Sequence, residues 1–129
     1  MRGMMVVKIK NFIKVNSLGE AYNLLQEDSS NLIVGGGAWL KLTNKEVGTM
    51  IDLENLELDT IVEDDSSITI GAMTLLRDIE ISKPIVDLAN GILANAVKGI
   101  MGISIRNIAT LGGSIMGRYS FSDILTPLL

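Results

Sequence analysis

A run of three glycines is the first feature of this sequence that could do chemistry. It lies between a short apolar stretch and an aromatic residue, in the order Ile33, Val34, Gly35, Gly36, Gly37, Ala38 and Trp39. Glycines that join a strand to a helix leave backbone N–H groups uncovered beside the helix N-terminus, and these groups can bind a phosphate without a lysine. The run matches neither the six-position dinucleotide fingerprint nor the Walker loop. A tight turn that requires positive φ values is an alternative explanation, so both interpretations stay open.

A second glycine-rich segment, at residues 105–115, carries small hydroxyl and amide side chains. It includes Ala109, Thr110, Gly112, Gly113 and Ser114, and a carboxylate, Asp123, follows ten positions after Gly113. Arg106 lies near the start of this segment and is either a surface charge or a structural clamp on backbone carbonyls. Asp123 is either a ligand of a polar group or the cap of a helix that starts after it.

The absence of two residue types excludes several classes of catalyst. The 129 residues contain no Cys and no His. The chain therefore has no disulfide framework, no thiolate-held iron–sulfur cluster and no imidazole for a Ser-His-Asp triad or a His-liganded zinc. The acidic run 63–65 falls in a predicted turn, where solvated surface charge is the better interpretation, and we predict no metal site. Chemistry on this chain must use carboxylates, Lys, hydroxyls, backbone amides or a cofactor.

Charge and hydropathy restrict the partners and the location. The chain has 11 Lys and Arg against 15 Asp and Glu, for a net charge of −4. It lacks the surplus of cations that a non-specific nucleic-acid binder needs. No uncharged apolar run reaches the ~18 residues of a membrane span, and Lys8 and Lys10 interrupt the apolar N-terminus before a signal-peptide core forms. We therefore expect a cytoplasmic protein with no nucleic-acid partner and no membrane span.

The elements that would position the first segment form an α/β pattern. β-branched residues predict a strand over 6–15, and the capping-box spacing of Ser17 and Glu20 predicts a helix that ends near Glu27. A short strand at 31–34 precedes the glycines, a second helix is expected to open at 38–42, and a further strand follows at 50–53. With a turn at 55–58 and little change in hydrophobicity near Asn55, a boundary there would separate packed subdomains rather than flexibly linked domains.

The second part is predicted to be α+β. β-rich stretches at 60–62 and 67–70 flank the acidic turn and indicate a hairpin. Helices are predicted at 74–81 and 84–101. The longer one has Pro84 in its first turn and Gly91 as a mild weakness, under ~1 kcal/mol relative to Ala. From Gly99 onward the sequence is rich in glycine and only weakly periodic.

Several groups of residues together resemble one known family. They are Val34-Gly-Gly-Gly-Ala-Trp-Leu40, Ile105-Arg-Asn-Ile-Ala-Thr-Leu-Gly-Gly-Ser-Ile115 and Ser122-Asp123, with Ile51-Asp-Leu53 and Ile70-Gly-Ala-Met-Thr74 between them. From about Lys10 onward the chain is similar to the FAD-binding subunit of molybdenum hydroxylases, the medium-chain proteins of the xanthine dehydrogenase and aerobic carbon monoxide dehydrogenase type. The 105–115 run is the specific part, and the first glycine loop is weak by itself.

The resemblance implies a PCMH-type FAD-binding fold of class α+β. A small N-terminal α/β subdomain, residues 1–56, would precede an incomplete α+β subdomain, residues 57–129, on a mainly antiparallel sheet. Residues 33–39 and 109–114 would hold the pyrophosphate and ribityl chain of FAD, and Asp123 would reach polar groups of the cofactor. Electrons would pass from a molybdopterin subunit through an iron–sulfur subunit to the flavin, and then to NAD or another acceptor. Ser114 and Arg118-Tyr119-Ser120 depart from the family pattern, so contacts near the ribityl chain would differ.

Members of that family continue well beyond the position of Leu129. We therefore expect a cofactor affinity below that of a full-length subunit and no activity from this part alone. We also expect an apolar edge around Leu125, Leu128 and Leu129 that self-association or a second chain covers. The alternatives are a non-catalytic binding or assembly module of the same fold, and an α+β domain whose glycines serve only turns. A yellow protein whose absorbance shifts with added FAD would favour the redox component.

Overall fold

The chain forms two compact units, Met1–Glu57 and Leu58–Leu129, which we describe separately. The computed structural model describes residues 6–117 and 123–129. Arg118, Tyr119, Ser120 and Ser122, which the sequence analysis singled out, lie outside the described residues.

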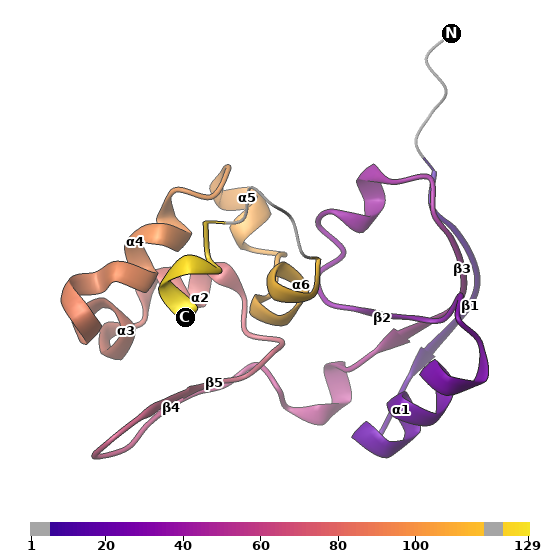
Figure 1. Cartoon of the computed structure of the whole chain (residues 1–129), viewed down its shortest axis with the longest axis horizontal. Helices are drawn as coiled ribbons and strands as arrows, with labels where there is room; N and C mark the ends of the chain where they lie inside the picture. The colour runs from indigo at the N-terminus through magenta and orange to yellow at the C-terminus, as the bar shows by residue number, and fades with distance from the viewer. Residues whose placement is uncertain (1–5, 118–122) are drawn as a thin grey trace, which may run out of the picture. The chain divides into compact units, whose positions relative to one another are not determined.

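The N-terminal unit is built on a three-stranded parallel sheet. Its strands are β1 (Lys8–Lys14), β2 (Leu32–Val34) and β3 (Glu46–Asp52), in the order β1-β3-β2. The helix α1 (Leu18–Glu27) packs against β2 and β3 (Figure 1). Val15, Val47 and Ile51 are completely or almost completely buried and form the centre of this small core. The predicted α/β character of this part is confirmed.

The start of α1 follows the predicted capping pattern with one change. The Ser17 hydroxyl oxygen accepts a hydrogen bond from the Glu20 amide at 3.1 Å. The Glu20 carboxylate reaches back to the amide of Asn16 at 2.9 Å, one residue before the Ser17 amide that a standard capping box uses. The first bond satisfies an N–H group that the first turn of a helix leaves without a partner, and the second ties the residue before the cap to that turn.

The prediction of a second helix that opens at 38–42 is wrong. Only one turn of 3-10 helix forms, Leu40–Leu42. The amide and the hydroxyl of Thr43 both donate to the carbonyl of Leu40, at 3.0 and 2.7 Å, and this closes the turn. β3 then begins at Glu46, earlier than the predicted 50–53, so too few residues remain between β2 and β3 for a longer helix.

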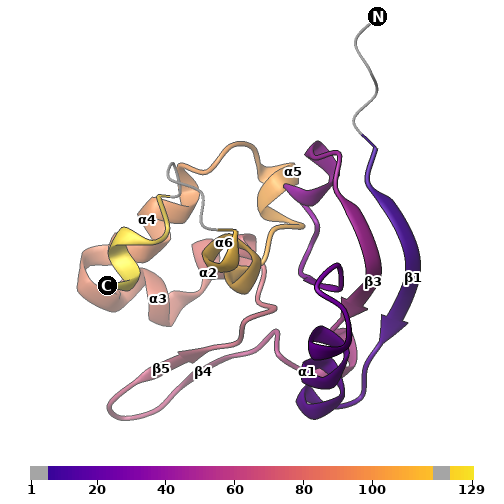
Figure 2. The same cartoon turned by 45° about the vertical axis from the view of Figure 1, so that its right-hand side comes forward.

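The C-terminal unit opens with the predicted antiparallel hairpin. Its strands are β4 (Ile61–Glu63) and β5 (Ile68–Ile70). Figures 1 and 2 show it extending away from the helices of this unit. The carboxylate of Asp64 closes the turn by accepting hydrogen bonds from the amides and hydroxyls of Ser66 and Ser67 at 2.8–3.1 Å. These bonds lower the pKa of Asp64 from 3.8 to about 2, led by the Ser66 amide.

Short helices make up the rest of this unit. They are α2 (Leu76–Ile81), α3 (Lys83–Asp87), α4 (Ile92–Lys98), α5 (Ile103–Arg106) and α6 (Leu111–Met116). Turns of 3-10 helix occur at Leu88–Gly91 and Thr126–Leu128, and another at Glu54–Leu56 ends the N-terminal unit. The core draws side chains from α2, α3, α4 and α6 and from the segment before the last 3-10 turn: Leu76, Ile79, Ile85, Leu93, Val97, Leu111 and Ile124.

The single long helix that we expected over 84–101 is also wrong, although Pro84 does lie in the first turn of α3. The backbone breaks at Ala89, Asn90 and Gly91, whose φ angles are 46°, 59° and 73°. These left-handed values end α3 and let the chain change direction before α4 begins. The apolar side chains of both helices are then buried in the same core. Gly91 is therefore a break between helices rather than a weak point inside one.

Two further findings concern what the described residues could form. Within residues 6–117 and 123–129, no helix has both the length and the apolar character that crossing a membrane requires. The same residues contain no group of three or more His, Cys, Asp or Glu side chains that could hold a metal ion.

Candidate functional site

The first glycine segment leaves the parallel sheet at the carboxyl ends of its strands. β2 ends at Val34, which pairs with Asp52, the last residue of β3, and Asp52 in turn pairs with Lys14, the last residue of β1. All three strands therefore end at one edge. In open α/β sheets, ligands bind in the crevice at this edge, beside the loops that follow the strands.

The loop itself exposes backbone donors. Gly36 is exposed and Gly35 is half-buried, whereas Ala38 is 5% exposed and anchors the loop in the core. Within the described part of the N-terminal unit, the amides of Gly35 and Gly36 donate no hydrogen bond to another residue. Gly37 has a φ of +66°, which only glycine adopts without strain. Two adjacent free amides on side-chain-free residues can approach an anion closely.

The neighbouring elements fix where this loop begins. Asn31 stands directly before β2, and its side-chain amide donates to the carbonyl of Leu24 in α1 at 2.7 Å. Its side-chain oxygen accepts from the amide of Thr49 in β3, also at 2.7 Å. Gly48 allows this arrangement because a β-carbon there would lie only 2.8 Å from that oxygen. Asn31 thus joins helix and sheet at the point where the strand to the glycines starts.

One ion pair lies near the carboxyl edge. Lys14 bonds to the carboxylate of Glu54, which raises the pKa of Lys14 and lowers that of Glu54. Both side chains are largely exposed, and exposed pairs of this kind add little stability. The Lys14 ammonium at the end of β1 is thus balanced by the Glu54 carboxylate.

The second glycine segment has a different character, because it forms the start of a helix. Thr110 caps α6, with its hydroxyl oxygen accepting from the amide of Gly113 at 3.2 Å. The other amides of this first turn also have partners. The amides of Leu111, Gly112 and Ser114 donate to the carbonyls of Thr74, Ala72 and Thr110, at 2.9, 2.7 and 3.0 Å. In this conformation the segment offers few free backbone donors.

Gly112 has a packing role that the sequence pattern does not reveal. A β-carbon at this position would lie 2.8 Å from the carbonyl oxygen of Ala72 and 3.1 Å from its β-carbon. The glycine therefore lets the start of α6 pack directly on the backbone at residue 72. Gly113, in contrast, is exposed.

The remaining predicted site residues divide by burial. Val34, Gly37 and Trp39 are half-buried and Ile33 is 37% exposed, whereas Ala109, Thr110 and Ser114 are all buried. Asp123 is exposed, and it does not cap the helical turn after it, whose first flanking residue is Leu125. Arg106 is a buried clamp on backbone carbonyls, as one of the two interpretations of the sequence predicted.

Sequence reasoning missed that the segment is tied to α2. Leu75 and Thr110 form an antiparallel bridge, in which the amide of Leu76 donates to the carbonyl of Ala109 at 2.9 Å. The sequence also gave no indication of α5 and α6. A threonine followed by a short apolar and glycine run is a weak helix start, because glycine lowers helix propensity.

A family of known domains matches nearly the whole chain. The sequence model described as the FAD binding domain in molybdopterin dehydrogenase matches residues 7–129. The carbon monoxide dehydrogenase medium chain of Hydrogenophaga pseudoflava is 40% identical over 113 residues, which cover 83% of this chain and 39% of that protein. The putative xanthine dehydrogenase FAD-binding subunit of Escherichia coli K12 is 30% identical over 125 residues, covering 92% and 42%. The chain thus spans about two fifths of the length of these relatives.

Solved structures agree with the sequence comparison. Carbon monoxide dehydrogenase from Hydrogenophaga pseudoflava, in a form lacking the Mo-pyranopterin moiety, superposes with a TM-score of 0.73 at 34% identity, over 86% of this chain and 40% of that one. A Cu,Mo-CO dehydrogenase in its cyanide-inactivated form gives a TM-score of 0.79 at 23% identity, over 88% and 41%, and shows the fold alone. The predicted α+β, PCMH-type fold class is confirmed.

Proposed function

Because this chain belongs to the family of FAD-binding domains in molybdopterin dehydrogenases, we propose that it is the FAD-holding part of an electron-transfer subunit. The membership confirms the resemblance drawn from the sequence and assigns FAD as the cofactor. The proposal rests on particular residues of the glycine loop at the carboxyl edge of the parallel sheet, because the amides of Gly35 and Gly36 donate to no other residue among 6–117 and 123–129.

These amides fit one part of FAD, its pyrophosphate. In the proposed site, Gly35, Gly36 and Gly37 bring backbone N–H groups to the phosphate oxygens, and Ile33, Val34, Ala38 and Trp39 shape the loop around them. Binding through neutral amides suits a chain whose net charge is −4, because no lysine is needed to hold the anion.

The second segment has a narrower role in this proposal. The amides of Leu111, Gly112 and Ser114 already donate to backbone carbonyls. Ala109, Thr110, Gly112, Gly113 and Ser114 would therefore present a shaped surface to the ribityl chain rather than a full set of donors, with exposed Gly113 nearest to it. Asp123 is exposed and able to accept a hydrogen bond from a polar group of the cofactor.

The wider electron path belongs to the proposal as well. When bound, FAD accepts electrons and passes them on, and the protein supplies binding, orientation and electrostatics. The electrons would come from a molybdopterin subunit through an iron–sulfur subunit in the cytoplasm, and would go to NAD or another acceptor. Because the chain contains no Cys and no His, the iron–sulfur and molybdenum centres of this path would be held by the partner subunits.

A paired substitution tests the proposal. Gly36→Asp places a carboxylate where the pyrophosphate would lie, and two such charges about 4 Å apart repel by about 1–4 kcal/mol, depending on exposure. We expect FAD affinity, measured by quenching of flavin fluorescence at fixed ionic strength, to fall about fivefold or more. The control is Gly102→Asp, which adds the same charge at a site with no atom within 4 Å of a new β-carbon, and should leave the affinity within about twofold.

Two results would contradict the proposal. Equal loss of affinity in both variants would mean that net charge, not the loop, decides binding. A wild-type chain that binds no FAD but associates tightly with an iron–sulfur partner would favour the assembly module instead.

A further inference from the structure

A buried ion pair joins α2 to α5 in the C-terminal unit. The side chains of Arg106 and Glu80 are only 10% and 8% exposed. The Nε of Arg106 donates to one carboxylate oxygen of Glu80 at 2.8 Å, and Nη2 donates to the other at 3.5 Å. Removing one member of a buried pair leaves the other charge without compensation, so such pairs constrain the elements that carry them.

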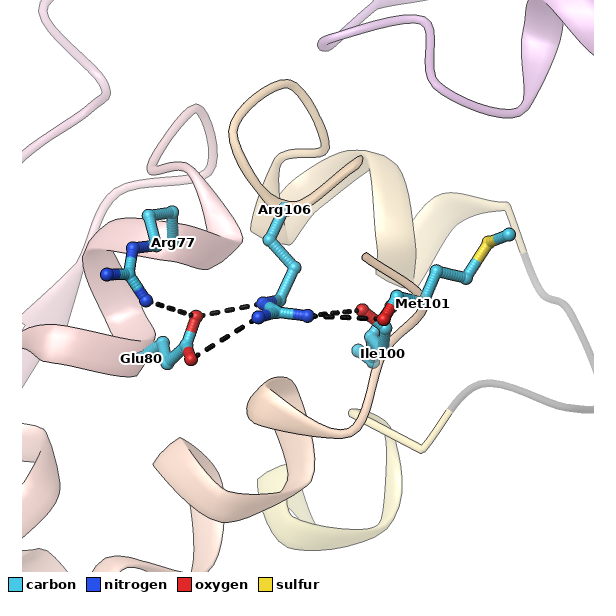
Figure 3. Close-up of polar contacts among 5 residues, drawn as sticks. All are labelled: Arg77, Glu80, Ile100, Met101 and Arg106. Carbon is cyan, nitrogen blue, oxygen red and sulfur yellow. Dashed lines mark hydrogen bonds and ion pairs between the residues drawn. The ribbon is translucent and has the colours of Figure 1, made fainter. Parts of the chain in front are cut away.

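The same guanidinium holds a third piece of backbone. Its Nη1 donates to the carbonyls of Ile100 and Met101 at 2.9 and 3.4 Å (Figure 3). Met101 has a φ of 42°, an unfavourable value for a residue with a side chain. Arg106 therefore fixes the turn before α5, the end of α5 and α2 relative to one another, using one planar group with donors in fixed directions.

This clamp lies next to the second glycine segment. Arg106 is the last residue of α5, and Ala109 follows after two residues. Ala109 and Thr110 are in turn bonded to the start of α2 through the Leu75–Thr110 bridge. The stretch 107–110 is thus tied to both ends of α2. Arg106, directly before the stretch, bonds to Glu80 in the last turn of α2, and Thr110 pairs with Leu75 just before the first turn.

We propose that Glu80 and Arg106 are positioning residues for the second FAD-binding segment. They touch no cofactor. Instead, they hold residues 109–113 so that Thr110 caps α6 and Gly113 is presented on the surface. This inference rests on the proposed function for its meaning, but the positioning itself can be measured without FAD.

Arg77 provides a matched control within the same cluster. It donates to the same Glu80 oxygen, Oε2, at 2.9 Å, but it lies on α2 itself and is 32% exposed. Figure 3 shows Glu80 between the two guanidiniums. Hydrogen bonds from Arg77 and then from Arg106 lower the pKa of Glu80, against the opposing effect of burial. Arg77→Gln thus removes an ion pair with Glu80 without removing any bond to residues 100–113.

The experiment compares amide hydrogen exchange and FAD affinity in Glu80→Gln, Arg77→Gln and the wild type. Exchange is measured first without FAD. We expect Glu80→Gln to speed exchange at Gly112 and Gly113 about tenfold or more while Val97 in α4 stays protected, and FAD affinity to fall about tenfold. Arg77→Gln should leave exchange at those two glycines and FAD affinity within about twofold of the wild type.

A folding defect is separable from the proposal. If Glu80→Gln unfolds because the Arg106 charge has no partner, the neutral double variant Glu80→Gln/Arg106→Gln removes that charge and should show the same exchange and affinity changes in a folded chain. Wild-type exchange at Gly112 and Gly113 in either folded variant would overturn the proposal. A wild-type chain that fails to bind FAD would contradict the proposed function alone, because the exchange result stands by itself.

Discussion

Gly112 brings the start of α6 closer to its neighbour than any side chain permits. A β-carbon there would lie 2.8 Å from the carbonyl oxygen of Ala72, which is backbone and cannot rotate away. We expect Gly112→Ala to lower the free energy of unfolding by about 1–3 kcal/mol, the usual range for overpacking. Urea denaturation measures this, with Gly102→Ala as the control, since a methyl group at Gly102 enters open space. Equal stability of the two variants would show that Gly112 is free for a purely cofactor-binding role.

The lowered pKa of Asp64 predicts how the stability of the hairpin turn depends on pH. Its folded pKa is lowered to about 2 by the hydrogen bonds from Ser66 and Ser67. A lowered pKa means that the carboxylate stabilises the hairpin turn fully above its unfolded value near 3.8, and that this stabilisation is lost as the pH falls toward 2. NMR titration of the Asp64 carboxyl carbon should therefore give a midpoint near 2.

The control for that titration is the double variant Ser66→Ala/Ser67→Ala. It removes both hydroxyl donors to the Asp64 carboxylate and keeps the backbone amides. The midpoint should then rise toward the ordinary value. An unchanged midpoint would mean that the hydroxyls do not contribute to the turn.

At the scale of elements, the sequence predicted what local signals dictate and missed what tertiary contacts impose. The strand at 6–15, the capped helix from Ser17 and the hairpin around Asp64 have period, cap and turn residues in agreement, and all form. The helix expected at 38–42 fails because the chain must re-enter the sheet at Glu46. Helices α5 and α6 carry weak local signals, and their bonds run to distant residues such as Thr74 and Glu80.

The break between α3 and α4 gives a test at this scale. Ala89 has a φ of 46°, which costs a residue with a β-carbon about 1 kcal/mol. We expect Ala89→Gly to raise the free energy of unfolding by about 0.5–1 kcal/mol. Ala96→Gly, inside α4, should lower the free energy of unfolding by a similar amount. Ala96 is in an ordinary helical conformation, so glycine there relieves no strain and only adds backbone entropy to the unfolded chain. Denaturation curves that show the same sign for both variants would contradict the described break.

For the whole molecule, the predicted site residues are divided between the two units. The loop 33–39 belongs to Met1–Glu57, and residues 109–114 and Asp123 belong to Leu58–Leu129. The clusters of glycine and their neighbouring residues were enough to identify both segments from the sequence. The sequence could not reveal that amides in the second segment already have partners, since Ala72 and Thr74 supply these acceptors from elsewhere in the chain.

The most direct test of the account is a titration of the wild-type chain with FAD followed by the amide NMR signals of both segments. We predict that Gly35, Gly36 and Gly113 shift along one binding curve with a single dissociation constant, while the amide of Gly102, at the control position, stays in place. Shifts confined to one segment, or two curves with different constants, would contradict a single FAD held by both.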